Sequence, residues 1–251
     1  MPGTSQRVAP VYDPATGRQS AEVDLASVEE VDHAVAVARE AQRTWREVPL
    51  ARRVQVLFAL REAVVAREDD LAAVITAQHG KTLADAAGEV LRGLECIEFA
   101  CGIPELVKGD ASSQVAAGVD VRSLRQPLGV VGCITPFNFP CMVPLWMLPN
   151  AIACGNAVVL KPSERDPGPS VLLAELFQQA GLPDGVLNVV HGDQVAVNRL
   201  LEHPDVAAIS FVGSTPVARH VYERGTAAGK RGGAGVRHDP WRRAGVRQRG
   251  Q

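Results

Sequence analysis

Asn138 lies in the segment Pro136 to Trp146, PFNFPCMVPLW, which is otherwise apolar enough to be buried. It is an uncharged amide between two phenylalanines and two prolines. A buried amide without hydrogen-bond partners costs about 1 to 3 kcal/mol. Two interpretations follow: the side chain ties down a turn after a strand, or its NH2 group points into a crevice as a donor to an oxyanion.

Two further segments carry groups that suit a nucleotide. Lys161 and Glu164 lie three residues apart in KPSER, where they could hold ribose hydroxyls or form a solvated surface pair. The turn Gly213-Ser214-Thr215 opens a helical pattern, and backbone N–H groups at a helix N-terminus suit a pyrophosphate. A serine or threonine before Pro216 is equally an ordinary helix cap. The GxGxxG fingerprint of ordinary dinucleotide-binding folds follows none of the expected strands.

The elements that must position these groups alternate between strand and helix. Short aliphatic runs typical of buried strands occur at 129–136, 156–163, 185–192 and 207–214. Helical patterns separate them at 143–155, 169–181 and 194–204. This alternation predicts an α/β fold with a parallel sheet covered on both faces. Because ligands bind at the carboxyl ends of such strands, the polar groups named above should meet in one crevice.

The first half of the chain is predicted to be helical after an extended N-terminal arm over residues 1–26. The helical part, 27–109, opens with Ser27 and Glu30 in capping-box spacing. A second helix is expected to run without interruption from 50 to 79, and another over 82–103. Residues 110–127 alternate in polarity and are broken by Gly118, which predicts a pair of β segments.

Composition limits the class of protein. Of 251 residues, 46% are hydrophobic and 22% charged, and the net charge is −2, which is typical of a globular protein. The sequence has neither a run of 18 apolar residues nor an export signal, so we expect a cytoplasmic protein with no membrane association. The five cysteines lack metal-ligand spacing, so we expect buried thiols and no metal site.

Residues 231–251 differ from the rest of the chain. They hold six arginines against one aspartate and show no apolar period. We therefore expect no fifth strand here, and our hypothesis is a frameshifted or misjoined, disordered end. A basic tail that binds nucleic acid is the less favoured alternative.

In combination, these segments resemble the aldehyde dehydrogenase superfamily from Val11 to Arg231. The markers are DPATG, HGKT, PLGVVGCITPFNFP, GNAVVLKPSE and ISFVGST, in register. Within the superfamily, EVLRGLECIEFACG, PFNFPCMVPLWMLP and LKPSER are similar to the CoA-acylating methylmalonate- and malonate-semialdehyde dehydrogenases. The resemblance implies an incomplete Rossmann-like NAD-binding domain, with a truncated βαβ core at 128–230 and an oligomerisation hairpin at 110–127.

The resemblance also implies a role for each candidate residue. NAD would contact Thr135, Phe137, Lys161, Glu164, Arg165 and Ser214, with Lys161 and Glu164 at the adenosine ribose. Asn138 would be the side-chain donor of the oxyanion hole. Arg92 would bind the substrate carboxylate through its guanidinium group. On spacing alone, a solvated helix arginine is the favoured interpretation of Arg92.

The implied reaction is NAD-dependent oxidation of a small aldehyde, methylmalonate or malonate semialdehyde, to an acyl-CoA, with CoA as co-substrate. The family forms dimers or tetramers, but whether this chain assembles is left open. The family's nucleophilic cysteine has no counterpart among the five cysteines, so we expect the 251-residue chain alone to form no NADH. The alternatives are a non-acylating aldehyde dehydrogenase fragment, or a non-catalytic nucleotide-binding or interaction protein with an exposed sheet edge.

Overall fold

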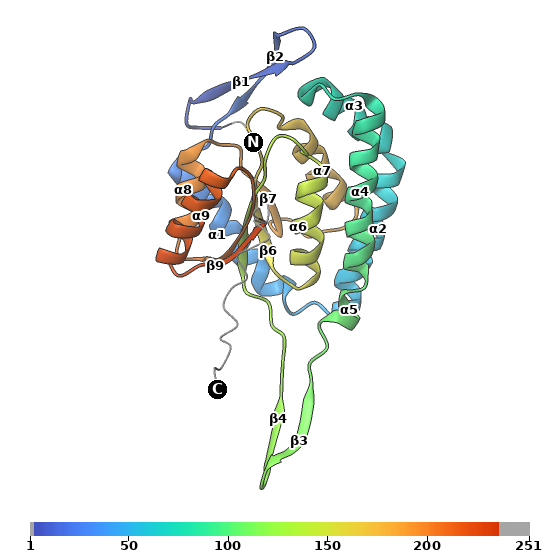
Figure 1. The fold of residues 1–251 in the computed structure, drawn as a ribbon, viewed down its shortest axis with the longest axis vertical. Coiled ribbons are helices and arrows are strands. Elements are labelled where there is room, and N and C mark those ends of the chain that lie inside the picture. The colour runs from blue at the N-terminus through green and yellow to red at the C-terminus, as the bar shows by residue number, and fades with distance from the viewer. Residues whose placement is uncertain (1–2, 236–251) are drawn as a thin grey trace, which may run out of the picture.

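A five-stranded parallel sheet forms the centre of the molecule (Figure 1). The computed structural model describes residues 3–235. The strand order is β7-β6-β5-β8-β9, and every neighbouring pair is parallel. The bounds are β5 Val130–Ile134, β6 Ala157–Lys161, β7 Leu187–Val189, β8 Val206–Val212 and β9 Arg231–Gly235. The predicted α/β class with a parallel sheet is confirmed.

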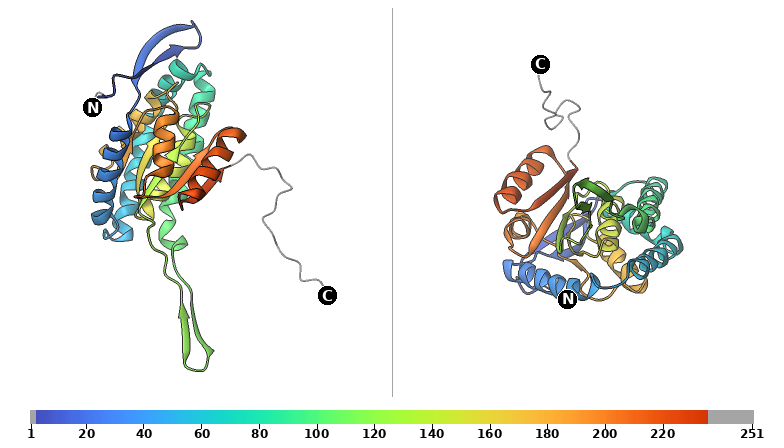
Figure 2. Two further views of the ribbon diagram at one scale, coloured as in Figure 1. Left: turned by 90° about the vertical axis from the view of Figure 1, so that its left-hand side faces the viewer. Right: turned by 90° about the horizontal axis from the view of Figure 1, so that it is seen from below.

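Helices cover both faces of the sheet (Figures 1 and 2). One face packs against α1 Val28–Trp45, α8 Gln194–Glu202 and α9 Thr215–Ala227. The other face packs against α6 Met142–Ala153 and α7 Gly168–Gln179. Beyond α6 lies an outer layer of α2 Leu50–Ala66, α3 Glu68–His79, α4 Leu83–Cys101 and the short α5 Ile103–Leu106.

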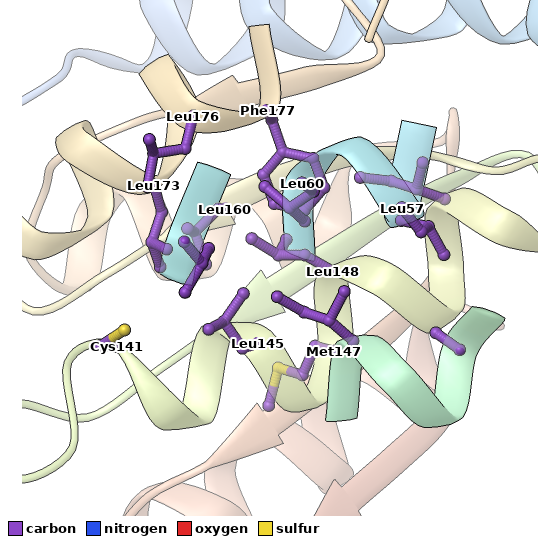
Figure 3. Packing of buried hydrophobic residues seen from close by; sticks show 14 of the residues in the cluster. Leu57, Leu60, Cys141, Leu145, Met147, Leu148, Leu160, Leu173, Leu176 and Phe177 are labelled. Carbon is purple, nitrogen blue, oxygen red and sulfur yellow. The ribbon is translucent and has the colours of Figure 1, made fainter. Parts of the chain in front are cut away.

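The buried residues of β5 alternate between two cores, as the two-residue period of a strand requires. Val131 and Cys133 belong to the core on the α6 side, whereas Val130 and Ile134 belong to the core on the α1 side. Figure 3 shows the α6 side, where leucines of α6 pack against leucines of α2. Because both faces of β5 are buried, the strand reads as an unbroken apolar run.

The sequence patterns predicted some helix boundaries correctly and others incorrectly. The Ser27–Glu30 capping box at the start of α1 is present in both directions, as predicted. The continuous helix expected over 50–79 is wrong, because the chain breaks at Arg67, whose φ of −119° and ψ of 20° lie outside helical values. The break turns α3 so that it contacts α4 and α7.

Two β-hairpins extend from the body of the molecule (Figure 1). The N-terminal arm folds back on itself as β1 Val8–Asp13 paired with β2 Arg18–Asp24, so it is a hairpin rather than a single extended segment. The pair of β segments predicted at 110–127 forms β3 Ala111–Ala116 and β4 Val119–Arg122, with Gly118 at a φ of +73° in the turn. Every residue of β3 and β4 is exposed.

The prediction that no strand follows residue 230 is wrong. Residues 231–235 form β9, which pairs in parallel with β8 from Ala208 to Val212. The segment RGGAG lacks the aliphatic side chains that indicate a strand, but a ladder is made by backbone N–H and C=O groups, which glycine supplies equally well. The hypothesis of a disordered or frameshifted end also covers residues 236–251. These residues lie outside the described part of the chain.

Over residues 3–235, none of the helices combines the length and the apolar composition that a bilayer span requires. The same part of the chain holds no group of three or more His, Cys, Asp or Glu side chains arranged to bind a metal ion.

Candidate functional site

The strand order reverses direction between β5 and β8, which places a crevice at their carboxyl ends. From β5 the chain continues through β6 and β7 on one side of the sheet, and through β8 and β9 on the other. Thr135 follows β5 directly, and Ser214 lies two residues after β8. The topology therefore brings the segments after three of the predicted strands to one edge of the sheet.

Lys161 ends β6 in a buried position beside this crevice. Its side chain is 8% exposed, and its Nζ lies 3.2 Å from Oε2 of Glu164. The interpretation of these two residues as a solvated surface pair is therefore wrong for the lysine. The backbone N–H of Thr135 donates to the carbonyl of Lys161 at 3.2 Å, which ties the segment after β5 to the end of β6.

His191 is a residue of this region that the sequence patterns did not single out. It follows β7, and its Nδ1 is buried without a hydrogen-bond partner. Burial lowers its pKa to about 4, and the positive charge of Lys161 contributes to the decrease. The imidazole is therefore neutral at physiological pH.

Phe137 is exposed and lies in contact with two other side chains. Its ring stacks on His79 with centroids 6.3 Å apart. The Arg165 guanidinium lies 4.9 Å from the centre of the same ring. The predicted residues Phe137 and Arg165 are thus in contact, and both are exposed.

Ser214 occupies the N-cap position of α9 and is exposed. Its backbone is extended, with a φ of −71° and a ψ of 152°, and its side chain makes no capping hydrogen bond. The hydroxyl is therefore not engaged in capping α9, which differs from the ordinary role of a serine at this position. Gly213 precedes it, and a Cβ there would lie 2.5 Å from the ring of Phe211.

Asn138 is exposed, so the expectation of a buried amide is wrong. Asn138 and Phe139 line an open depression of about 510 Å³ instead of entering the core. Within the described part of the chain, the Asn138 side chain forms no hydrogen bond. Its NH2 group is therefore not tied to a turn, which was the alternative to a donor role.

Arg92 lies on α4 and lines the same depression as Asn138. Its side chain is 71% exposed and lies 3.6 Å from Glu95, a distance that gives only a weak surface interaction. In exposure it is a solvated helix arginine, but in position it shares one concave surface with the amide.

A larger groove of about 1590 Å³ lies between the β1–β2 hairpin and helices α1, α3 and α7, and it holds none of the predicted site residues.

Lys81 and Glu89 form a buried ion pair behind Asn138 that the sequence analysis missed. Nζ of Lys81 lies 2.5 Å from Oε2 of Glu89, and the two side chains are 10% and 1% exposed. Lys81 also donates to the backbone carbonyl of Asn138 at 3.1 Å. The only sequence signal was an acidic residue at a position of α4 that faces the core.

All five cysteines are free thiols with raised pKa values. Burial raises the pKa of Cys133 to about 12 and raises that of Cys141 as well. Figure 3 shows Cys141 at the start of α6, beside the leucine core. A thiol must ionise to act as a nucleophile, so these cysteines do not supply one.

The family model described as "Aldehyde dehydrogenase family" matches residues 1–233. This chain belongs to that family. The match runs into β9, so the family pattern includes the fifth strand and does not stop at residue 230.

Sequence relatives of this aldehyde dehydrogenase chain include malonate-semialdehyde dehydrogenase of Pseudomonas aeruginosa, 52% identical over 231 residues. That alignment covers 92% of this chain and 46% of the relative. Malonate-semialdehyde dehydrogenase 2 of Geobacillus kaustophilus is 54% identical over 227 residues, which cover 90% of this chain and 47% of the relative. The chain therefore spans about half the length of the curated relatives it matches.

Solved structures show the same relation. The methylmalonate-semialdehyde dehydrogenase of Oceanimonas doudoroffii aligns with a TM-score of 0.90 at 50% identity, covering 92% of this chain and 47% of that one. A structure from Sinorhizobium meliloti, titled as the same kind of enzyme in complex with NAD, aligns with a TM-score of 0.91 at 48% identity and the same coverage.

Proposed function

We propose that this chain provides the nucleotide-binding region and part of the substrate pocket of an NAD-dependent, CoA-acylating dehydrogenase of malonate or methylmalonate semialdehyde. The observation that carries the proposal is the shared depression in which Asn138 and Arg92 lie beside the sheet crevice. An oxyanion donor and a carboxylate-binding cation on one concave surface suit a short aldehyde that bears a carboxylate.

NAD is the proposed cofactor, and the residues at the crevice fit it. Lys161 and Glu164 offer a cation and a carboxylate, 3.2 Å apart, to the two hydroxyls of a ribose. The free hydroxyl of Ser214 and the N-terminus of the 13-residue helix α9 suit a pyrophosphate. Thr135, Phe137 and Arg165 line the segments between these groups. When bound, NAD supplies the hydride acceptor for aldehyde oxidation.

Asn138 is proposed to stabilise the oxyanion that forms when a thiolate adds to the aldehyde carbonyl. Its NH2 group is a neutral donor, free of other hydrogen bonds in the described residues, so no existing bond must break when the charge develops. A donor of this kind contributes about 10²- to 10³-fold to the rate. Arg92 is proposed to bind the carboxylate at the other end of the substrate.

CoA as the acyl acceptor, assembly into a homo-oligomer and a cytoplasmic location belong to the same proposal. Of these three, assembly is supported by the exposed β3–β4 hairpin. The thiolate has to come from outside the residues described, because the thiols of this chain have raised pKa values.

The test uses a hybrid enzyme in which residues 1–235 replace the matching half of the Pseudomonas aeruginosa relative. We expect the hybrid to form NADH from malonate semialdehyde, with CoA accelerating turnover. Asn138→Ala should lower kcat about 10²-fold or more. An unchanged kcat in this variant would contradict the oxyanion role, and turnover that is indifferent to CoA would favour the non-acylating alternative.

Arg92→Leu tests the substrate class in the same hybrid. We expect the KM for malonate semialdehyde to rise at least about tenfold, because a charge-assisted hydrogen bond contributes roughly 1.5 to 3 kcal/mol. Propanal has no carboxylate and serves as the control substrate. Equal changes for the two aldehydes would remove Arg92 from substrate recognition.

A further inference from the structure

A buried ion pair, Lys81–Glu89, holds the loop that carries Asn138. The pair therefore does more than fill space in the core, because it also fixes the position of this loop. Glu89 of α4 accepts hydrogen bonds from the backbone N–H groups of Cys141 at 2.8 Å and Met142 at 3.1 Å through Oε1. Its Oε2 accepts from Lys81. One carboxylate therefore fixes the N-terminus of α6 and orients a cation.

Glu89 replaces the missing cap of α6. The N-cap residue of this helix, Cys141, has no side chain that caps it, so the first N–H groups depend on a partner from elsewhere. A carboxylate at a helix N-terminus also interacts favourably with the helix dipole. Glu89 thereby fixes the start of α6 to α4. On α4, Glu89 lies three residues, about one helical turn, before Arg92.

Lys81 connects Glu89 to the segment that carries Asn138. Its ammonium group donates to the carbonyl oxygen of Asn138 at 3.1 Å and lies 4.6 Å from the centre of the Phe139 ring. Two successive residues of the exposed rim are thus held by one buried cation. Because the Asn138 amide has no other bond in the described residues, its position depends on its own backbone, which Lys81 fixes.

We propose that Lys81 and Glu89 are positioning residues that hold Asn138 at a fixed place relative to Arg92. The inference rests on the proposed oxyanion role of Asn138. Misplacement of a catalytic group by about 1 Å can cost 10²-fold in rate, so a rigid connection from α4 to Asn138 is a functional requirement as well as a structural one.

The test replaces both charges at once with Lys81→Met and Glu89→Gln, because removing one alone leaves a buried unpaired charge. In the hybrid enzyme, kcat should fall about tenfold or more while the KM for malonate semialdehyde changes less than about threefold. Adding Asn138→Ala to this double variant should lower kcat by a smaller factor than the same change does in the parent, because part of the Asn138 contribution is already lost. Full additivity, or an unchanged kcat, would overturn the proposal.

A second variant tests the proposal if the double variant folds poorly. Lys81→Arg keeps a cation that can donate to Glu89 and Asn138, and its kcat should stay within about threefold of the parent. A loss as large as that of the double variant would contradict the proposal. The control is Asp32→Asn with Arg199→Met, which removes an ion pair between α1 and α8; its kcat should equal that of the parent.

Backbone ¹⁵N relaxation on the 251-residue chain tests the positioning without catalysis. The order parameter of Asn138 should drop below about 0.6 in the double variant and remain near 0.85 in the parent and the control. An unchanged order parameter would refute the structural connection. If instead Asn138→Ala left kcat intact while the order parameter dropped, the oxyanion role would fail and the positioning would stand.

Discussion

At the scale of single residues, the site region holds buried charges that have partners and one buried carboxyl group, Asp166, that has none in the described residues. Lys161 and the Lys81–Glu89 pair are buried yet paired, which keeps the energetic cost of their charges low. Asp166 is the opposite case: it is 1% exposed, and neither of its carboxylate oxygens has a partner. Burial raises its pKa to about 8, and the nearby Glu89 carboxylate adds to the increase.

Asp166 should make the stability of the chain fall as the pH rises from about 4 toward 8. Its folded pKa of about 8 exceeds the ordinary value of 3.8, so the folded state binds a proton that the unfolded state has lost. Stability from this source is complete below the unfolded pKa and is lost as the pH rises toward 8. His191 has a pKa lowered to about 4 and acts in the opposite direction, but only below about pH 6.5.

Urea unfolding at pH 6.5 and pH 8 checks this prediction. The free energy of unfolding should be about 1.5 kcal/mol lower at the higher pH. Asp166→Asn removes the titrating group and should abolish the difference between the two pH values. A variant that keeps the same pH dependence would assign the effect to another group.

At the scale of elements, the ends of helices are fixed by contacts with distant parts of the chain. The last turn of α6 is an example, because Trp45 of α1 donates to the carbonyl of Ile152 at 2.9 Å and Gln42 donates to that of Gly155 at 3.1 Å. Arg53 of α2 approaches the same turn closely, and a Cβ on Gly155 would lie 1.9 Å from its Nη1. The helix end therefore leaves no room for a side chain.

Gly155→Ala should be far more destabilising than Gly181→Ala. Both glycines follow a helix and have a left-handed φ, +86° and +87° respectively, so the backbone strain is matched. That strain costs about 1 to 2 kcal/mol in each case. A Cβ at 181 meets no atom within 4 Å, whereas one at 155 collides with a buried guanidinium.

Thermal and urea unfolding of the two variants separates strain from collision. Gly181→Ala should lose about 1 kcal/mol, and Gly155→Ala about 3 kcal/mol or more, as for other overpacked sites. Equal losses would show that Arg53 moves aside without cost.

At the scale of the whole molecule, the sheet and its helices form the body and the β3–β4 hairpin projects from it (Figure 2). The hairpin exposes Val115, Val119 and Val121, at 54%, 47% and 52%. An isolated two-stranded hairpin is at best marginally stable in water, so a surface that covered these apolar side chains would stabilise it. The proposed homo-oligomer supplies such a surface.

Val121→Lys should weaken assembly of the hybrid enzyme, whereas Val8→Lys should not. The two valines have nearly equal exposure, 52% and 51%, and each lies in a hairpin, so the variants differ only in which hairpin carries the charge. A buried interface disfavours an unpaired ammonium group. Light scattering measures the mass of each variant, and equal masses for both would exclude the β3–β4 hairpin from the interface.

The sequence by itself determined the elements whose signals are local. The capping box at Ser27, the turn at Gly118 and the four apolar strand runs each depend on a few neighbouring residues, and together they gave the α/β class and the edge of the sheet where the crevice lies. The family motifs then assigned roles to residues at that edge. None of these inferences required knowing which helix packs on which.

Features that depend on distant partners in the chain become visible only in three dimensions. β9 is a strand because β8 offers a free edge, although its own residues carry no strand signal. Asn138 is exposed because Lys81 and Glu89, more than 45 residues earlier in the chain, hold its loop at the rim. The hydrogen bonds from Glu89 to the start of α6 and the Lys81–Glu89 ion pair join residues that are distant in the sequence, so a local sequence pattern does not indicate them.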